Sequence, residues 1–400
     1  MGTVPPPRCD DTREADYREG AARLRLGPGF FQPDSRTARD LTVLLCARLG
    51  AGGPVRMLDL MSGCGIRALR CGLEAGGGIQ EIWANDGDAD RLELIRRNLA
   101  PLRQVWLQEQ AGRRLRCTAL PAHDLLAHCR LKRHRFDLVD LDGFGSISDL
   151  VPAVLPVLAF GGVLVLTSSD GRSPTGHDRI GAVRHHLAAA RAHPCSWEIA
   201  LRLQLALIAR SAWAMGHDLE PLLQISDGRT FRSAVRLRRR LDPASTRRVG
   251  LLGRCDACGD QQLQPLLRLN RWPACCCSQP GRSLAVSGPL WLGPLQNTEL
   301  CRELLELADA RPSAGGPQIT RATRRQLQRL TEDPGLPALC WSLAELGRRI
   351  GGGPPPQQRL LERLRQLGHR ASASAIAPGR FRTEAPWPEV LRAARDLSDV

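Results

Sequence analysis

The sequence predicts an α/β protein with a Rossmann-like, mostly parallel sheet and a smaller α+β C-terminal domain. Short apolar segments alternate with stretches of helical spacing from residue 55 to residue 167, which is the pattern of a doubly wound sheet. After residue 240 the pattern changes to shorter elements around a cysteine-rich stretch at 255–277. We therefore expect one domain at 1–240, including an N-terminal extension, and a second domain at 241–400.

The expected elements follow from hydrophobic spacing and turn residues. In the first domain the order is strand 55–60, helix 66–74, strand 81–84, helix 88–99, strand 136–141, helix 151–158, strand 163–167, helix 196–216 and strand 231–237. In the second domain, helices are expected near 299–309, 338–349 and 357–367. Residues 1–29 are rich in Pro, Arg and Gly and are expected to form a loosely structured lead-in.

The charge of the chain favours a polyanionic partner. Its 400 residues carry 56 Lys and Arg against 41 Asp and Glu, a formal net charge of +15. Phosphate groups attract such a surface, so nucleic acid is the expected partner. Lys132 is the only lysine. A GC-rich genome explains this preference for Arg over Lys, but it does not explain the excess of cations over anions.

The ends of the chain and its cysteines indicate a cytoplasmic protein. Residues 1–20 lack the apolar run of a secretory signal, and no segment reaches the roughly 18 apolar residues of a membrane span. In that compartment the 14 Cys are expected to be free thiols or metal ligands rather than disulfides.

The turn after the first strand has the pattern of a cofactor loop. Asp59 ends the strand, and Gly63 and Gly65 follow before the first helix. Glycines at such a turn let the backbone approach a ligand closely. A carboxylate at Asp59 would repel a pyrophosphate but attract the ammonium group of methionine. The loop therefore favours S-adenosylmethionine over a dinucleotide.

Two further acids stand where they could hold the rest of that cofactor. Asp86 follows the second strand, where a carboxylate can accept both ribose hydroxyls, although it could instead cap the next helix. Asp124 follows the presumed third strand and could accept from the adenine amino group, although alone it could equally be a surface acid. The chain order of Asp59, Asp86 and Asp124 favours the cofactor role for all three.

The fourth strand ends in Asp140-Leu141-Asp142-Gly143-Phe144-Gly145, a pattern typical of methyltransferases acting on base amino groups. The lone pair of such a nitrogen is delocalised into the ring, so an acceptor such as Asp142 must increase its nucleophilicity and aim it at the methyl group. Phe144 could stack on the base. The alternative is an ordinary turn at Asp142-Gly143 with Phe144 in the core.

Several blocks in order resemble the tRNA guanine N2-dimethyltransferases that modify position 26. Asp140 to Ser146 is similar to the family's Asp-Leu-Asp-Pro-Phe-Gly-Ser, and Thr167-Ser168-Ser169-Asp170 to its Thr-Ala-Thr-Asp. The other similar blocks are Phe30-Phe31-Gln32-Pro33, Arg39-Asp40, Glu198 with Leu201-Arg202, Pro221-Leu222-Leu223, Gly288 to Leu295, and Phe381-Arg382-Thr383. Their order over about 350 residues carries the resemblance.

The resemblance implies transfer of methyl groups from S-adenosylmethionine to the N2 amino group of guanine 26 in tRNA, twice. The residues implied to hold the cofactor are Arg39, Asp59, Asp86 and Asp124. Asp142 would accept from the guanine amino group, with Phe30 and Phe144 near the target base. The Arg-rich segments 238–240 and 247–248 could contact tRNA phosphates, although a solvated helix end explains them equally well.

The chain departs from the family pattern at several positions outside the block 167–170 as well as within it. Gly143 replaces Pro in the catalytic turn, which leaves the rigidity of that turn in question. The other departures outside that block are Phe31 for Tyr, Gln32 for Asn, Ala38 for Asn and Ala375 for His. The alternative functions are methylation of adenine N6 or of ribosomal guanine N2, and RNA binding without catalysis.

The cysteine-rich stretch has the spacing of a zinc site. Cys255 and Cys258 form a C-x-x-C pair, and three consecutive cysteines follow at 275–277. Cys275 and Cys277 are the expected partners, with Cys276 facing away. Relatives in the resembled family often carry such a cluster. The alternative is a site that has decayed and holds free thiols.

Overall fold

The computed structural model describes residues 16–28, 31–109, 112–275, 277, 284–310 and 316–398. They form two compact units. Unit 1 contains the described residues up to Asp142 together with 156–165 and 303–325, and unit 2 contains 143–155, 166–302 and the described residues from Gln326 onward. Neither unit is a continuous piece of chain. The domain boundary at residue 240 therefore stays a prediction.

Seven strands form one mixed sheet in the order β5-β4-β3-β6-β7-β9-β8, as the α/β pattern predicts. The strands are β3 (Val55–Asp59), β4 (Ile79–Asn85), β5 (Arg114–Thr118), β6 (Phe136–Asp142), β7 (Leu158–Ser168), β8 (Asp218–Ser226) and β9 (Phe231–Arg238). The pairs β3–β4, β3–β6 and β4–β5 are parallel, and β8–β9 is antiparallel. The chain runs from β3 outward to β5 and then returns to the other side of β3, so the carboxyl ends of β3 and β6 form the switch point where ligands bind in such sheets.

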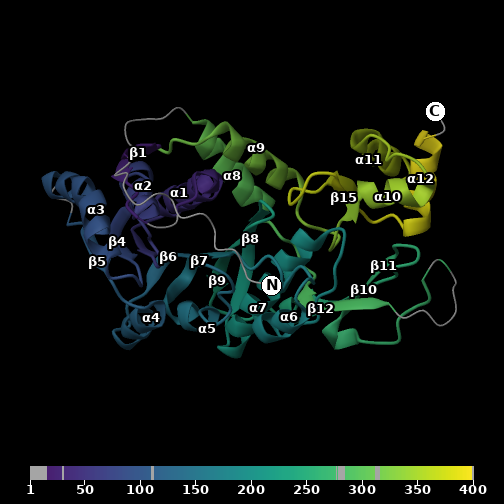
Figure 1. Ribbon diagram of the computed structural model, residues 1–400, viewed down its shortest axis with the longest axis horizontal. Coiled ribbons are helices and arrows are strands. Elements are labelled where there is room, and N and C mark those ends of the chain that lie inside the picture. Colours follow the sequence, from purple (N-terminus) through teal and green to yellow (C-terminus); the bar gives the residue numbers. More distant parts are fainter. Residues whose placement is uncertain are drawn as a thin grey trace. The chain divides into compact units, whose positions relative to one another are not determined.

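Helices cover both faces of the strands in unit 1. They are α1 (Arg36–Gly50), α2 (Ile66–Glu74), α3 (Arg91–Gln108) and α4 (Ala122–Leu131). In Figure 1, α1 and α2 lie on one side of the strands and α4 on the other. The middle strands can be apolar on both faces because helices cover both: β3 and β6 are buried at nearly every position.

Two predictions about unit 1 are corrected by the structure. Residues 16–25 are not a loose lead-in but an antiparallel hairpin of β1 (Asp16–Glu19) and β2 (Ala22–Arg25). The second helix extends from Arg91 to Gln108 and contains Pro101, well beyond its expected end at residue 99. Helices α1 and α4 were not expected. A short 3-10 turn, η1 (Pro33–Ser35), directly precedes α1.

Unit 2 is built on a helix that was predicted from its spacing. This helix, α7 (Ser196–Ala214), is buried along most of its length rather than on one face. The helix expected at 151–158 is shorter. It is α5 (Val151–Val154), followed by a 3-10 turn, η2 (Leu155–Val157), before β7 begins at Leu158. Helix α6 (Arg179–His186) lies between β7 and α7 in the chain.

The C-terminal part of unit 2 is α+β, as predicted. One three-stranded sheet has the order β11-β10-β12, and another has the order β13-β15-β14. Its strands and 3-10 turns are η3 (Ser245–Arg248), β10 (Val249–Arg254), β11 (Gln261–Pro265), η4 (Leu266–Arg268), β12 (Ala285–Trp291), β13 (Trp341–Ser342), β14 (Ala371–Ala373) and β15 (Arg380–Thr383). The helices from residue 298 onward, of which α8 and α9 have residues in both units, are α8 (Thr298–Asp309), α9 (Arg321–Glu332), α10 (Leu343–Ile350), α11 (Gln357–Gln366) and α12 (Trp387–Ser398).

An apolar cluster holds the last helices together. Leu346, Leu361, Phe381 and Trp387 are buried within it. The Trp387 ring stacks on Trp341 with centroids 4.3 Å apart.

Within the described part of the chain, no helix is both long and apolar enough to cross a membrane.

Candidate active site and cysteine cluster

The loop between β3 and α2 has the backbone that its glycines predict. Gly63 and Gly65 have φ angles of +58° and +82°, a region that side-chain-bearing residues rarely adopt. A Cβ added at Gly63 would meet no atom within 4 Å, so the loop is open on that side. The Gly63 amide donates to Asp86 Oδ2 at 2.8 Å. The loop after β3 is thus tied to the predicted ribose-binding acid after β4.

Asp59 is a buried carboxylate with one oxygen unused. Its Oδ2 accepts from the Ala68 amide at 3.2 Å, while Oδ1 has no hydrogen-bond partner among the described residues. Burial, and after it the neighbouring charge of Asp140, raise the pKa of Asp59 to about 7 against the opposing effect of Arg67. A buried acceptor without a partner beside an open glycine loop fits a cationic amine.

Asn85 organises the loops that follow three parallel strands. Its side-chain amide donates to the carbonyls of Leu60 and Leu120, both at 3.0 Å, and its oxygen accepts from the Leu120 amide and the Thr118 hydroxyl. Sequence reasoning missed Asn85, because only its place before Asp86 at a strand end could have indicated it. Asp86 is thereby held in position, and its Oδ1 accepts from the Asp88 amide at 3.0 Å.

Asp124 lies in the first turn of α4 and is exposed. This places it on the segment that follows β5, as the prediction requires. An exposed acid near a helix N-terminus also has a purely local stabilising effect through the helix dipole. Its adenine-binding role therefore stays a prediction.

One arginine, Arg67, contacts two acids near the carboxyl end of β6. Arg67, 7% exposed, contacts the carboxylate of Asp142 through Nη2, and its Nε lies 3.5 Å from Asp140 Oδ2. Asp140 is fully buried and also accepts from the Thr42 hydroxyl at 2.7 Å. Arg67 was missed from the sequence, where its only signal is a cation two residues after Gly65. Three carboxylates around one guanidinium leave an excess of negative charge that favours a cationic ligand.

The two aromatic predictions have different outcomes. The Phe144 side chain is 73% exposed, so it is not the core residue of the alternative interpretation. Phe30 lies outside the described residues, and its place near the target base stays a prediction.

Arg39 is engaged by groups of the protein itself. It is 3% exposed, and its Nη2 and Nε donate to Glu19 at 2.6 and 2.8 Å. It also donates to the carbonyls of Gln32 and Pro33. The guanidinium carbon lies 5.0 Å from the centre of the Phe31 ring. In this structure Arg39 anchors the β1–β2 hairpin. Its contact with a methionine carboxylate stays a prediction, and it requires the Arg39 guanidinium to bind Glu19 and that carboxylate at the same time.

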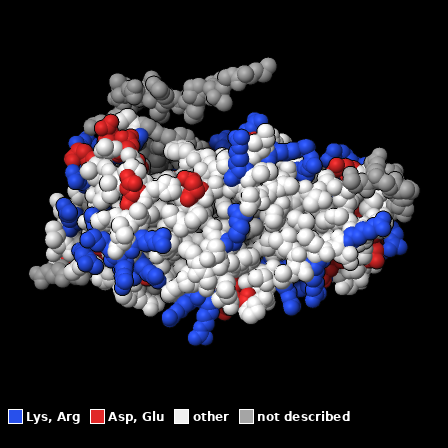
Figure 2. Space-filling model, turned by 90° about the horizontal axis from the view of Figure 1, so that it is seen from below, with Lys and Arg blue, Asp and Glu red and all other residues white. Residues whose placement is uncertain are grey.

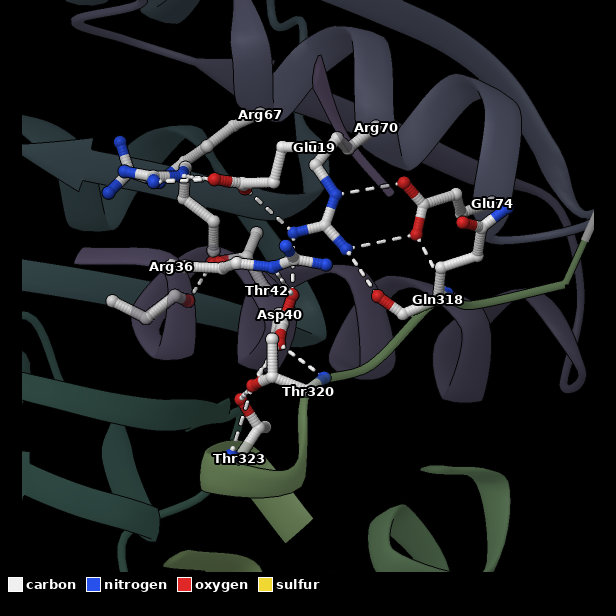
Figure 3. A network of polar contacts seen from close by, with 12 residues as sticks. Glu19, Arg36, Asp40, Thr42, Arg67, Arg70, Glu74, Gln318, Thr320 and Thr323 are labelled. Carbon is white, nitrogen blue, oxygen red and sulfur yellow. Dashed lines mark hydrogen bonds and ion pairs between the residues drawn. The ribbon is translucent and has the colours of Figure 1, made fainter. Parts of the chain in front are cut away.

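A second buried arginine extends this anchor (Figure 3). Arg70 donates to Glu19 at 2.9 Å, to Asp40 at 2.6 Å and to Glu74 at 2.8 Å. Asp40 in turn accepts from Thr320 and Thr323. The network joins the hairpin, α1, α2 and the segment that begins α9. None of these pairs was predicted, because each joins residues far apart in the chain or hidden on a helix face.

The four predicted zinc ligands come together. One ligand atom from each of Cys255, Cys258, Cys275 and Cys277 lies within 4.8 Å of all the others. The sulfurs of Cys255 and Cys277 are 3.8 Å apart, close to the edge of a tetrahedron with zinc–sulfur bonds of about 2.3 Å. Cys276 lies outside the described residues. The donor set fits a tetrahedral soft metal such as zinc.

The helices of the C-terminal sheet hold the first cysteine pair. The Gly259 amide donates to the Cys255 carbonyl at 2.8 Å, which closes the turn. Trp387 Nε1 donates to the Cys258 carbonyl at 2.7 Å, and Arg349 Nη2 to the Asp256 carbonyl at 3.0 Å. The turn 255–259 therefore contacts both α10 and α12.

Comparison with known proteins identifies the family. The family model described as N2,N2-dimethylguanosine tRNA methyltransferase matches residues 23–395. The chain belongs to this family. The match covers the β3–α2 loop, the end of β6 and the cysteine cluster, and it confirms the resemblance found in the sequence.

Relatives of full length agree with this membership. The tRNA (guanine(26)-N(2))-dimethyltransferase of Thermococcus kodakarensis is 28% identical over 383 residues, covering 94% of this chain and 96% of that protein. The enzyme of the same name from Methanosphaerula palustris is 29% identical, covering 92% and 91%. The fold is that of Trm1 from Pyrococcus horikoshii, solved in complex with S-adenosyl-L-methionine. That structure has a TM-score of 0.78 at 23% identity and covers 95% of this chain and 99% of that one.

Proposed function

We propose that this member of the family is a tRNA (guanine(26)-N(2))-dimethyltransferase that uses S-adenosylmethionine. The observation that carries the proposal is Asp142 at the carboxyl end of β6, held by Arg67 and followed two residues later by the exposed Phe144. An acceptor and an aromatic ring at this strand end are what a base amino group needs in order to be oriented for methylation.

The cofactor site would be the β3–α2 loop and the strand ends beside it. The unpartnered Asp59 Oδ1 and the open side of Gly63 support this assignment. Asp59 would accept from the methionine ammonium group, Asp86 from the ribose hydroxyls and Asp124 from the adenine amino group. Gly63 and Gly65 would let the backbone approach the cofactor closely. Arg39 would bind the methionine carboxylate. When bound, S-adenosylmethionine supplies an electrophilic methyl group.

The residues at the end of β6 would act on the guanine. The Asp142 carboxylate accepts hydrogen bonds from the N–H groups of the exocyclic amino group, which increases the electron density on the nitrogen. It then takes the proton that this nitrogen loses on methylation. The Arg67 guanidinium contacts the Asp142 carboxylate and would hold it in place at the end of the strand. Phe144 stacks on the base, and Phe30 would do so from the N-terminal side. No metal is needed for these steps.

The basic surface supports tRNA as the substrate. Figure 2 shows one face of the molecule, on which Lys and Arg side chains outnumber Asp and Glu. Among the proposed phosphate contacts, Arg238 pairs with Glu220 and Arg248 with Asp242, so these two are partly neutralised. Such contacts position the RNA without reading its sequence. A tRNA-modifying role agrees with the cytoplasmic location expected from the sequence.

In vitro methylation of one tRNA transcript tests the function. The transcript with guanine at position 26 should yield N2,N2-dimethylguanosine on nucleoside mass spectrometry, and the same transcript with adenine at position 26 should yield none. Methylation of ribosomal RNA instead, or of an adenine, would replace this proposal with one of its alternatives. Loss of N2,N2-dimethylguanosine from the tRNA of a deletion strain checks the same conclusion in the cell.

Asp142→Ala is the matched test of mechanism. The rate should fall by about a hundredfold or more, the size of effect expected for a positioned acid–base group. Cofactor affinity measured by calorimetry should stay unchanged. Asp137→Ala removes a carboxylate from the other end of the same strand, where it pairs with Arg56, and should leave the rate close to wild type. Equal loss of rate and cofactor affinity in Asp142→Ala would mean that Asp142 belongs to the cofactor site.

A further inference from the structure

The turn after β6 has unusual freedom for a catalytic segment. We call residues 143–146 the catalytic turn; it runs Gly143-Phe144-Gly145-Ser146 directly after Asp142. Glycine on both sides of Phe144 allows more backbone conformations than any other residue would. Gly145 has a φ of +68°, a left-handed conformation that favours glycine. Some other restraint must therefore fix the direction of the Phe144 side chain.

Four hydrogen bonds supply that restraint, and all come from the end of β7 and the residue after it. The Gly143 amide donates to the Thr167 carbonyl at 3.3 Å, and the Gly145 amide donates to Ser169 Oγ at 2.7 Å. The Gly145 carbonyl accepts twice, from the Ser169 amide at 3.2 Å and from Ser168 Oγ at 2.8 Å. Both peptide groups of Gly145 are thus fixed to residues 168 and 169.

Two of these bonds depend on the positions where this chain departs from the signatures it resembles. The Gly143 amide donor would be absent with proline at 143, because proline has no N–H. The Ser168 hydroxyl would be absent with alanine at 168. Ser168 is 6% exposed, and its hydroxyl donates to the Gly145 carbonyl while it accepts from the Asp170 amide at 3.1 Å. The two departures therefore act on the same four-residue turn.

We propose that Ser168 and Ser169 are positioning residues that clamp the catalytic turn, and that the Ser168 hydroxyl replaces the restraint that a proline ring at 143 would supply. A ring that limits φ and one buried hydrogen bond are restraints of similar size. The inference rests on the proposed function, because it takes Phe144 to be the residue that stacks on the target base. It predicts that residues 143 and 168 are energetically coupled.

A double-mutant cycle tests that coupling. The four proteins are wild type, Ser168→Ala, Gly143→Pro, and the double variant. Proline is compatible with this position because Asp142 before it is in a strand, the conformation that a residue preceding proline prefers. Ser168→Ala should lower kcat for tRNA methylation by about threefold to tenfold, the size expected when one buried hydrogen bond is lost. KM for S-adenosylmethionine should not change.

The decisive result is the effect of Ser168→Ala in the proline background. It should shrink to less than twofold, because the ring already restrains the turn. Ser148→Ala is the matched control: this hydroxyl lies just after the catalytic turn, accepts from Ser146 Oγ at 3.1 Å and takes no part in the four bonds to residues 167–169. Its kcat should be close to that of wild type. An equal loss from Ser168→Ala in both backgrounds, or no loss in either, would overturn the clamp.

Hydrogen exchange separates this inference from the proposed function. The amides of Gly143 and Gly145 should exchange faster in Ser168→Ala than in wild type, and Gly145 should regain protection in the double variant. This readout does not require methylation. Unchanged exchange in Ser168→Ala rejects the clamp even if the enzyme methylates guanine 26. A wild-type protein that does not methylate the transcript, yet shows the exchange pattern, rejects the function and retains the clamp.

Discussion

The carboxyl group of Asp59 titrates close to neutrality, which is unusual for an aspartate. Its burial is the main cause, and the negative charge of Asp140 adds to it. A cationic amine bound at the unpartnered Oδ1 would lower the pKa of Asp59 again, because it favours the ionised carboxylate. Cofactor binding should therefore release a proton at any pH below about 7.

That release gives S-adenosylmethionine binding a defined pH dependence. Below pH 7 the association constant should fall by up to tenfold per unit, because the carboxyl must first lose its proton. Above pH 7 this effect should vanish. Calorimetry in buffers of different ionisation enthalpy measures the proton count directly. Asp59→Asn should bind more weakly and lose this pH dependence, whereas a variant with the wild-type slope would show that another group titrates.

At the scale of single residues, the sequence predicted the acids but not their partners. Asp59, Asp86 and Asp142 could be found because strand ends and glycine turns are local patterns. Arg67 and Asn85 could not, because their roles depend on strands that become neighbours only in the folded sheet. The same limit applies to Glu19, whose burial requires two arginines from different helices.

Other residues of the recognised blocks prove to be structural. Glu198 is buried between Arg202 and Arg382, with distances of 2.7 Å to each. Burial would raise its pKa, but the two arginines, Arg382 foremost, lower it to about 2. The block around Glu198 and the block around Phe381 therefore meet in one ion network. Their separation in the chain hid this link from sequence reasoning.

Among the elements, the hairpin shows why short strands are hard to predict. Its two strands have four residues each and carry charged side chains that would normally mark a loop. They are stable because Glu19 meets Arg39 and Arg70, and because the Arg25 backbone bonds both side-chain ends of Asn98. Such stabilisation comes from α1, α2 and α3 and leaves no periodic signal in the hairpin itself.

The turn 255–259 should depend on a metal for its structure. We expect about one zinc per chain, and Cys258→Ser should remove it, because serine does not replace a thiolate ligand. Loss of the metal should also lower the thermal midpoint, since the turn supports Trp387 and Arg349 on the last helices. Cys117→Ser is the matched control, a half-buried thiol outside the cluster. Metal analysis with a stoichiometry near zero in wild type would favour free thiols instead.

For the molecule as a whole, hydrophobic periodicity predicted the class of fold but carried no signal for the grouping of segments into the two compact units. The parallel strands, the central helix α7 and the α+β character of the C-terminal part all followed from periodicity. The grouping of 303–325 with the first part of the chain in unit 1 did not, because it depends on contacts such as those of Asp40 with Thr320 and Thr323. A chain that returns to an earlier unit leaves no mark in composition.

Part of the net charge of +15 is gathered in one exposed cluster of basic side chains, which lies far from Asp142. Arg130, Lys132, Arg133 and Arg135 surround the turn between α4 and β6, and all four are exposed. This turn precedes Phe136, the first residue of β6, whereas Asp142 is the last. Seven residues of strand span about 20 Å. A phosphate bound at this turn would belong to a part of the tRNA distant from the target base.

Reversing charge at this turn should therefore weaken tRNA binding without slowing the chemistry. In Lys132→Glu with Arg133→Glu, KM for tRNA should rise at least tenfold. The slope of log affinity against log salt should become shallower by about 1.5, as expected for two lost phosphate contacts. The value of kcat at saturating tRNA, and the affinity for S-adenosylmethionine, should stay at wild type.

The matched control is Arg359→Glu with Arg392→Glu, on α11 and α12, which lowers the formal charge from +15 to +11 just as the first pair does. An equal rise in KM for both double variants would mean that total charge, and not this turn, attracts the tRNA.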